Sequence, residues 1–537
     1  MTTFGVPSAP LKPASQPRYV RQPWVLFVVF ISCLVVLPIT FAARQSFWID
    51  EAMTWDISSR ASIGEVLGAI RSTQASEAQM PGYLLYAYLW ARIGGTGEAW
   101  SRLSNLAWLL IAGAVWWSWS GSLFRRDPTK RTIFLAMLLT SPFLTYYALE
   151  YRPYAALTAL GGMTVYGLLL NAKDDGRGRW LVLTGLICST ALNMLSFVQL
   201  PCVILYEGWR CRRDLRAAAR SWLLPSVIAM LVLLPLGLYY AETLARHAGG
   251  TRVAPSIKNL AFIFYEFLGF DGLGPSRDVL HVNPRLAGFF GPAVYLAVLA
   301  IPLAILWAAS LRRLIPTEEW KRFISDGCRV ETVRAMVVFA GFGTLALWLA
   351  SLWAGFRILG RHTAFFFLPF LAGMTLLLLQ GRKGWRDLGI AALLAAQLLS
   401  SMRLVLKEEY ARDDYRTAVA VARRMARPTT LVVLTGNKSA FRYYGIPSEE
   451  FRGAGLSENR WLNVSNPTEA QWATLMQDWN EDVLVVLSKP YLYDVYGVIE
   501  RWIATRPASE LVAHPSTFQI WWVKGRRNSL VERKGPG

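Results

Sequence analysis

Charge and cysteine are both scarce in this chain of 537 residues. Charged side chains make up 17% of the chain and hydrophobic ones 54%. This balance excludes an ordinary soluble globular protein and predicts many membrane-spanning helices. The five cysteines lie in or beside apolar segments without paired spacing, which argues against a disulfide framework and a metal–thiolate site. They are Cys33, Cys188, Cys202, Cys211 and Cys328.

Other features are missing as well. There is no P-loop sequence, so ATP-driven transport is disfavoured. There is no internal repeat or low-complexity tract, although many transporters are built from repeated halves. Acidic residues are few, with 36 Asp and Glu against 56 Lys and Arg, for a net charge of +20. The basic excess is spread over loops between apolar runs, which argues against a nucleic-acid-binding patch.

Long apolar runs are abundant. About eleven segments approach the length needed to cross a membrane. They are 24–42, 103–123, 132–149, 153–170, 181–195, 197–209, 221–241, 287–310, 335–354, 363–380 and 387–404. The first has about twice the roughly 7–15-residue core of a signal peptide, so we expect a retained anchor, with cleavage as the alternative. The two short runs, 181–195 and 197–209, are expected to be tilted or broken.

Segment 81–93 decides the orientation. As a helix it would rise only about 20 Å, so we expect it to lie on the membrane surface. All basic loops then fall on the side of residues 1–23, which predicts that this side is cytoplasmic. These loops are 124–131, 173–179, 210–220, 311–322 and 381–386. The expected transmembrane domain spans 24–405, with 43–102 as its first outer loop.

The chain changes character after the last apolar run. Strand-length runs occur at 430–435, 483–487 and 517–523, and the segment 467–480 is typical of a helix with Thr468 as its cap. The predicted fold is therefore an α-helical polytopic membrane protein with a small extracytoplasmic α/β domain over 406–525. We expect residues 526–537 to be a disordered tail.

Charged side chains gather on the expected outer face. They are Asp50 and Glu51 in FWIDEAMTWD, Glu77 before the surface helix, Glu150 and Arg152 in YYALEYRPY, and Arg357, Arg361 and His362 around GRHTAFFFLPF. Charges at a membrane boundary are functional candidates because placing them there is costly. Each also has a plain structural explanation, such as a solvated loop for Asp50 and an ion pair between Arg152 and Glu150. Together they suit a site for an anionic lipid and a proton acceptor.

The ordered set of motifs resembles a known family over about residues 20–405. The motifs are the acidic pair at 47–56, the Pro-containing amphipathic helix 81–93, Arg102 in AWSRLSN, YYALEYRPY and GRHTAFFFLPF. This order is similar to the membrane-embedded GT-C glycosyltransferases. The similar branch includes protein O-mannosyltransferases, lipid A aminoarabinose transferase and bacterial lipopolysaccharide sugar transferases.

The resemblance implies an inverting transfer of a sugar from a polyprenyl-phosphate donor, on the periplasmic side of a bacterial inner membrane. The acceptor would be a hydroxyl of an envelope glycan, a glycolipid or a protein. Asp50 would be the general base, and Glu51 would support it or orient the acceptor. Arginines would stabilise the leaving lipid phosphate. The implied donor-phosphate residues are Arg152, Arg361, His362, Arg357, Tyr147 and Tyr154, and the supporting residues are Arg60, Glu77, Arg102, Glu150 and Lys258.

The chain departs from the family before the surface helix. Relatives often carry a His or Lys there, whereas this chain reads Gln79-Met80-Pro81. This chain therefore either lacks that contact or supplies it from elsewhere, with Arg60 and Lys258 as the candidates. No cofactor is certain. A divalent metal ion is an open option, with Asp50, Glu51, Glu77 and His281 as candidate ligands.

A transporter or flippase for lipid-linked sugars is the alternative. In that case the charges would line a translocation path. The gathering of the charges on one face favours the enzyme. The sequence leaves the sugar, its linkage, the acceptor and the oligomeric state open.

Overall fold

A computed structural model describes residues 23–73, 75–246, 255–276, 326–380, 383–446, 449–450, 460–477 and 479–525. Residues 1–22 of the predicted N-terminal segment 1–23, the predicted span 287–310, the predicted basic loop 311–322, His281 and the predicted tail 526–537 lie outside these residues.

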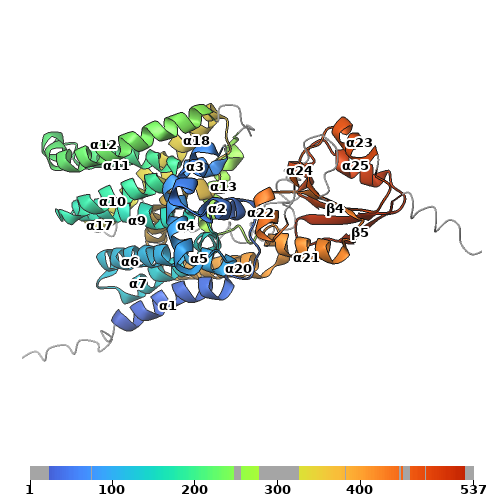
Figure 1. The fold of residues 1–537 in the computed structure, drawn as a ribbon. Coiled ribbons are helices and arrows are strands. Elements are labelled where there is room, and N and C mark those ends of the chain that lie inside the picture. Colours follow the sequence, from blue (N-terminus) through green and yellow to red (C-terminus); the bar gives the residue numbers. More distant parts are fainter. Residues whose placement is uncertain are drawn as a thin grey trace, which may run out of the picture.

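The larger part of the molecule is a helical bundle (Figure 1). Its long elements are α1 (Pro23–Phe41), α6 (Asn105–Phe124), α7 (Pro128–Leu139), α9 (Tyr154–Asn171), α10 (Arg177–Leu192), α11 (Gln199–Arg210), α12 (Leu215–Arg246), α17 (Gly327–Ala335), α18 (Thr344–Ala354), α19 (Phe367–Leu379) and α20 (Lys383–Leu406). A π-helical turn, Met336–Gly343, joins α17 to α18. The chain is thus a multi-pass helical membrane protein by its architecture, as predicted.

Seven helical segments within the described residues are long and apolar enough to cross a membrane. They are Trp24–Phe41, Glu98–Phe124, Tyr154–Asn171, Ala219–Arg246, Gly327–Ala354, Gly360–Leu379 and Arg386–Leu406. Helices α7, α10 and α11 overlap three other predicted runs, 132–149, 181–195 and 197–209. They contain only 12, 16 and 12 residues, which is short for crossing a membrane. The run 132–149 is interrupted at Ser141, whose extended backbone precedes Pro142, because a proline disfavours helical geometry in the preceding residue.

Shorter helices gather at one end of the bundle (Figure 1). They are α2 (Ile49–Ser58), α3 (Ile63–Ser72), α4 (Pro81–Gly94), α5 (Glu98–Leu103), α8 (Pro142–Ala148) and α13 (Ile257–Leu268). The 14-residue α4 covers the predicted surface helix; Tyr83 and Leu84 on it are buried, whereas Leu89 and Ile93 are exposed. Turns within three of the predicted basic loops, 124–131, 173–179 and 210–220, lie at the opposite end of the bundle.

Helix α9 lies at the centre of the bundle, packed against α6, α10, α19 and the 3-10 helix η6 (Gly360–Phe366). A Cβ on Gly161 would lie 2.0 Å from the carbonyl oxygen of Phe365. Glycine therefore lets the backbone of η6 lie directly against α9. This close approach places the start of η6, which carries Arg361, near the start of α9, which follows Arg152.

The C-terminal part is a small α/β domain, as predicted. Its described residues form a six-stranded mixed sheet covered by helices. Its strands are β1 (Leu431–Thr435), β2 (Glu449–Glu450), β3 (Trp461–Asn463), β4 (Val483–Ser488), β5 (Ser509–Ala513) and β6 (Phe518–Val523), in the order β2-β3-β1-β4-β6-β5. Strands β1 to β4 are parallel, and β6 and β5 are antiparallel. The helices are α21 (Tyr415–Met425), α22 (Lys438–Tyr443), α23 (Glu469–Gln477), α24 (Pro490–Tyr493) and α25 (Val498–Ala504). Thr468 caps α23 through its Oγ1, which accepts the Gln471 N–H at 3.2 Å.

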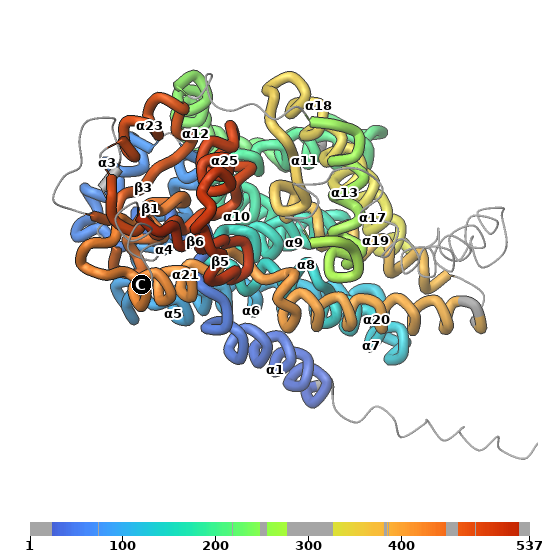
Figure 2. The backbone as a smooth tube through the Cα atoms, turned by 90° about the vertical axis from the view of Figure 1, so that its right-hand side faces the viewer, coloured from blue at the N-terminus to red at the C-terminus, as the bar shows by residue number. Residues whose placement is uncertain are grey.

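The buried strands explain the layering of this domain. All residues of β1 and β4 are buried, which requires a covered face on each side of the sheet. One face packs with α21 and α22, and the other with α23 and α25. In Figure 2 this domain lies in front of α4 and α10, with α13, α18 and α19 beside it.

Candidate functional site

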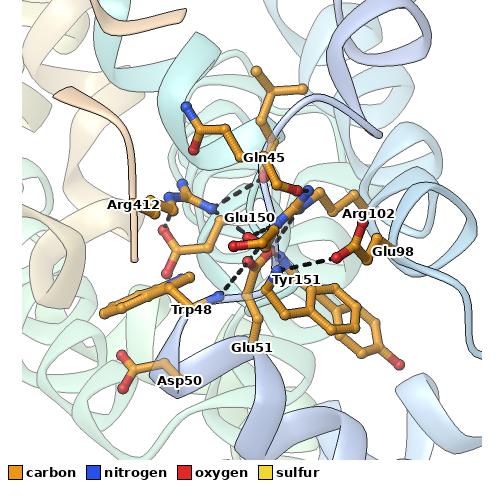
Figure 3. A network of polar contacts seen from close by, with 12 residues as sticks. Gln45, Trp48, Asp50, Glu51, Glu98, Arg102, Glu150, Tyr151 and Arg412 are labelled. Atoms are coloured by element: carbon orange, nitrogen blue, oxygen red, sulfur yellow. Dashed lines mark hydrogen bonds and ion pairs between the residues drawn. The ribbon is translucent and has the colours of Figure 1, made fainter. Parts of the chain in front are cut away.

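Helix α2 presents two adjacent acids in different directions. Asp50 and Glu51 occupy its first turn, where carboxylates interact favourably with the helix dipole. Successive residues of a helix point about 100° apart. Figure 3 shows the result: Glu51 points into a network of polar contacts, whereas Asp50 points away from it.

Glu51 is completely buried and held by Arg102. The guanidinium donates to both carboxylate oxygens, from Nε at 2.8 Å and from Nη2 at 2.6 Å. The Tyr151 backbone N–H adds a bond of 2.8 Å. Burial opposes ionisation of Glu51, but Arg102 outweighs it and holds the pKa of this carboxyl below its ordinary value. Arg102 also binds the carbonyls of Ala42, Gln45 and Ser46, so this pair fixes the turn between α1 and α2.

Arg412 extends the network from the segment that follows α20. Its guanidinium lies 3.2 Å from Glu150 and 3.5 Å from Glu51, and it binds the carbonyl oxygens of Tyr146 and Leu149. Burial raises the pKa of Glu150 even though Arg412 opposes this effect. The Glu150 Oε1 atom is buried without a hydrogen-bond partner. Arg412 therefore joins the C-terminal part of the chain to the acids at the end of the bundle.

Asp50 is the accessible carboxylate of the site. Its side chain is 19% exposed, and its Oδ2 lies 3.5 Å from Arg361 and 4.0 Å from Arg152. Arg152 is buried among acceptors: Glu77 at 2.6 Å, the Thr54 hydroxyl, the Ser76 hydroxyl and the Asp50 carbonyl. The structure thus places Arg152 beside Asp50, with the donors of Arg152 largely engaged within the protein.

The turn that carries Arg361 is held by Glu266 on α13. The Gly360 N–H donates to Glu266 Oε2, and the Tyr147 hydroxyl donates to Glu266 Oε1 at 3.4 Å. His362 accepts the Leu359 N–H at 3.0 Å through Nδ1, which stabilises the start of the same turn. The Arg361 guanidinium also lies over the Trp48 ring, with 5.6 Å between its Cζ and the ring centroid.

A cavity of about 150 Å³ opens beside these residues. Its lining includes Trp48, Tyr146, Arg357 and Arg361 from the bundle end, Asp271 after α13, Glu409, Arg412 and Asp413 from the segment after α20, and Lys489 and Tyr491 from the α/β domain. Burial and the neighbouring Arg361 lower the pKa of Arg357. Two guanidinium groups that line one cavity favour an anionic ligand there.

The remaining predicted residues lie elsewhere or serve packing. Arg60 pairs with Asp56 at 3.6 Å on a partly exposed face of α2, and Lys258 is exposed on the first turn of α13. Tyr154 is buried, with its ring centroid 5.1 Å from that of Tyr147. Within the described ranges, no group of three or more His, Cys, Asp or Glu is arranged to hold a metal ion.

The sequence interpretation missed Arg412, Glu266 and Lys489. Arg412 was signalled only by its place in EYARDDYR, directly after the last predicted span. Glu266 is an acid inside the otherwise apolar FIFYEFLGF, which is a usable signal because such a buried acid is costly. Lys489 follows the buried run of β4, where parallel strands commonly present ligand-binding residues.

These features define a class: a multi-pass helical membrane protein with a carboxylate–arginine site and a small α/β domain at one end of its bundle. No protein-family model and no curated protein matches the chain. Two solved structures of ArnT from Cupriavidus metallidurans are similar to it in arrangement. The one bound to undecaprenyl phosphate has a TM-score of 0.42 and 10% identity, and the apo one has 0.44 and 12%. Each comparison covers 93% of this chain and 98% of the other. We carry no residue role over from this likeness.

Proposed function

We propose that this protein is an inverting membrane glycosyltransferase that uses a polyprenyl-phosphate sugar donor. The observation that carries the proposal is the partly exposed Asp50 carboxylate beside Arg361. Arg361 also lines the cavity, together with Arg357 and Arg412. The ordered motifs in the sequence support the same activity. The acceptor is a hydroxyl of an envelope glycan, a glycolipid or a protein, at the periplasmic face of a bacterial inner membrane.

The proposed step needs one base and one cation-stabilised leaving group. Asp50 accepts the proton of the acceptor hydroxyl while the oxygen of that hydroxyl forms a bond to the anomeric carbon. The bond from that carbon to the phosphate oxygen breaks on the opposite face, and the electron pair leaves with the lipid phosphate. Arg361 and Arg357 stabilise the added negative charge, since fixed guanidinium groups in a partly dry cavity need little reorganisation.

The other charged residues position these groups. Glu51 and Arg102 occupy each other fully and fix the start of α2. Arg152 is held by Glu77 at 2.6 Å, and its guanidinium lies 4.0 Å from the Asp50 carboxylate. We therefore assign donor-phosphate binding to the cavity arginines Arg361 and Arg357, and a positioning role to Arg152.

Release of polyprenyl phosphate tests the proposal. Purified protein would receive a panel of polyprenyl-phosphate sugars with a crude envelope extract as acceptor. We expect turnover of one donor, reduced at least about a hundredfold in Asp50→Asn. Asp387→Asn is the matched control, because this partly exposed acid pairs with Arg386 at the start of α20; it should keep the wild-type rate.

Two outcomes would contradict the proposal. A normally folded Asp50→Asn with the wild-type rate would remove Asp50 as the base. Movement of the donor across the membrane of reconstituted vesicles, with no phosphate released for any donor, would support the flippase instead.

A further inference from the structure

The α/β domain turns one particular edge toward the bundle. The helices that follow parallel strands β1 and β4 are α22 and α24, and both lie on the bundle side of the sheet (Figure 1). On α22, Arg442 and the Ser439 hydroxyl bind Asp56 of α2. The carboxyl edge of the parallel strands therefore faces the site. In open α/β sheets this is the edge at which ligands bind.

Two residues at this edge have an unusual backbone. Lys489, directly after β4, has φ 38°, and Ser516, before β6, has φ 52°. A left-handed backbone is unfavourable for residues other than glycine. It persists where the surrounding structure enforces it, often at functional sites. Both side chains hold the same segment: Ser516 Oγ donates to the Arg412 carbonyl at 3.0 Å, and Lys489 Nζ lies 2.8 Å from Asp413 Oδ1.

Lys489 is thereby held on the wall of the cavity. Its side chain is 12% exposed, and it lines the same space as Arg357 and Arg361. Tyr491 of α24 lies close enough to Arg357 to interact with it electrostatically. The cavity volume of about 150 Å³ equals on the order of five water molecules at about 30 Å³ each. A phosphate group fits a space of this size.

We propose that the carboxyl edge of the α/β sheet is the second wall of the anion site, with Lys489 binding the ligand phosphate opposite Arg357 and Arg361. This inference rests on the proposed function, because the phosphate is that of the donor. Asp413 holds the ammonium group in the free protein. The arriving phosphate competes with Asp413 for Lys489, so the α/β domain takes part in donor binding itself.

Binding of farnesyl phosphate tests the role of Lys489, with farnesol as the uncharged comparison. The full-length protein in detergent would be titrated calorimetrically. Lys489→Gln should weaken farnesyl phosphate binding about tenfold, the effect of one lost charge-assisted hydrogen bond. Lys489→Arg should restore most of it. Lys438→Gln, at an exposed lysine of the same domain, should leave binding unchanged, and farnesol binding should not respond to any of these changes.

Asp413→Asn separates a ligand-binding role from a structural one. If Lys489 binds the phosphate, removing its competing partner should strengthen farnesyl phosphate binding severalfold. If the Lys489–Asp413 pair only supports the fold, both variants should weaken binding together, and the inference is wrong. Wild-type protein that binds farnesyl phosphate no better than farnesol would instead overturn the proposed function. A wild-type preference for the phosphate that Lys489→Gln retains in full would overturn the inference alone.

Discussion

The Asp50 carboxylate lies 3.5 Å from the Arg361 guanidinium, although 311 positions separate the two residues. This contact is longer than the roughly 2.7–2.9 Å of a tight charged hydrogen bond. The neighbouring Glu51 is bound to Arg102 at 2.6 and 2.8 Å. The adjacent acids therefore differ in availability: Glu51 is saturated by its partner, whereas the contact of Asp50 with Arg361 is looser, which suits the base in the proposed reaction.

Replacing Arg361 with lysine should impair donor binding. Lysine keeps the charge but loses the planar donor fork that matches a phosphate. We expect KM for the donor to rise by about tenfold to a hundredfold, the effect of a lost hydrogen bond to a charged group. Steady-state kinetics of Arg361→Lys would measure it. Arg501→Lys, at an exposed pair with Glu469 in the α/β domain, is the control, and an unchanged KM in Arg361→Lys would contradict the prediction.

Replacing Glu51 with glutamine should destabilise the protein. The change leaves the Arg102 charge buried without its bidentate partner, and breaking a buried pair in this way costs about 3–5 kcal/mol. Thermal unfolding in detergent, followed by tryptophan fluorescence, should show a clear fall in unfolding temperature. Glu469→Gln removes an exposed carboxylate and should change stability by less than about 0.5 kcal/mol. Equal unfolding temperatures for the two variants would show that the pair is not structural.

Glu51 and Glu150 should have opposite effects on the pH dependence of stability. The pKa of Glu51 is held below its ordinary value of 4.5 by Arg102. Its contribution is therefore complete above that pH and is lost as pH falls through the lowered pKa. Burial raises the pKa of Glu150 above 4.5, so its contribution is present below that pH and is lost as pH rises through the raised pKa.

Unfolding temperatures of three proteins between about pH 3.5 and about pH 6.5 would test this. Relative to wild type, Glu51→Gln should lose stability as pH rises, and Glu150→Gln should gain it. Parallel curves for both variants would mean that neither carboxyl has a shifted pKa in the folded protein.

The sequence predicted the architecture correctly where the length of an apolar run matches one kind of buried element. Runs such as 24–42 and 221–241 are apolar throughout, and LVVLT and VLVVLS are typical of strands buried on both faces. The short strands β2 and β3, of two and three residues, carry no periodic signal. Strand β3 pairs with the edge of β1, and β2 pairs with β3 in turn, so both depend on edges that only the folded sheet provides.

The site was readable only in part. The sequence placed Asp50, Arg152 and Arg361 on one face, and the structure brings their charged groups together. The resemblance assigned different roles to Asp50 and Glu51, but it did not predict that Arg102 holds Glu51, because this pairing depends on the helix phase of α2 and on the folded position of Arg102. From the sequence, Arg412 is expected to be a solvated arginine after a span. It is buried against Glu150 because the segment after α20 packs on the end of the bundle.

Replacing Gly360 with alanine should impair activity by displacing the turn that carries Arg361. A Cβ there would lie 2.1 Å from Glu266 Oε2, so either α13 or the turn has to move. A displacement on the order of 1 Å at a catalytic group reduces turnover by on the order of a hundredfold. We expect Gly360→Ala to lose kcat/KM on this scale, measured as polyprenyl phosphate release. Gly341→Ala is the matched control, because a Cβ at Gly341 meets no atom within 4 Å. If Gly360→Ala lowers the unfolding temperature no more than this control and still turns over donor at the wild-type rate, the position of Arg361 does not limit the reaction.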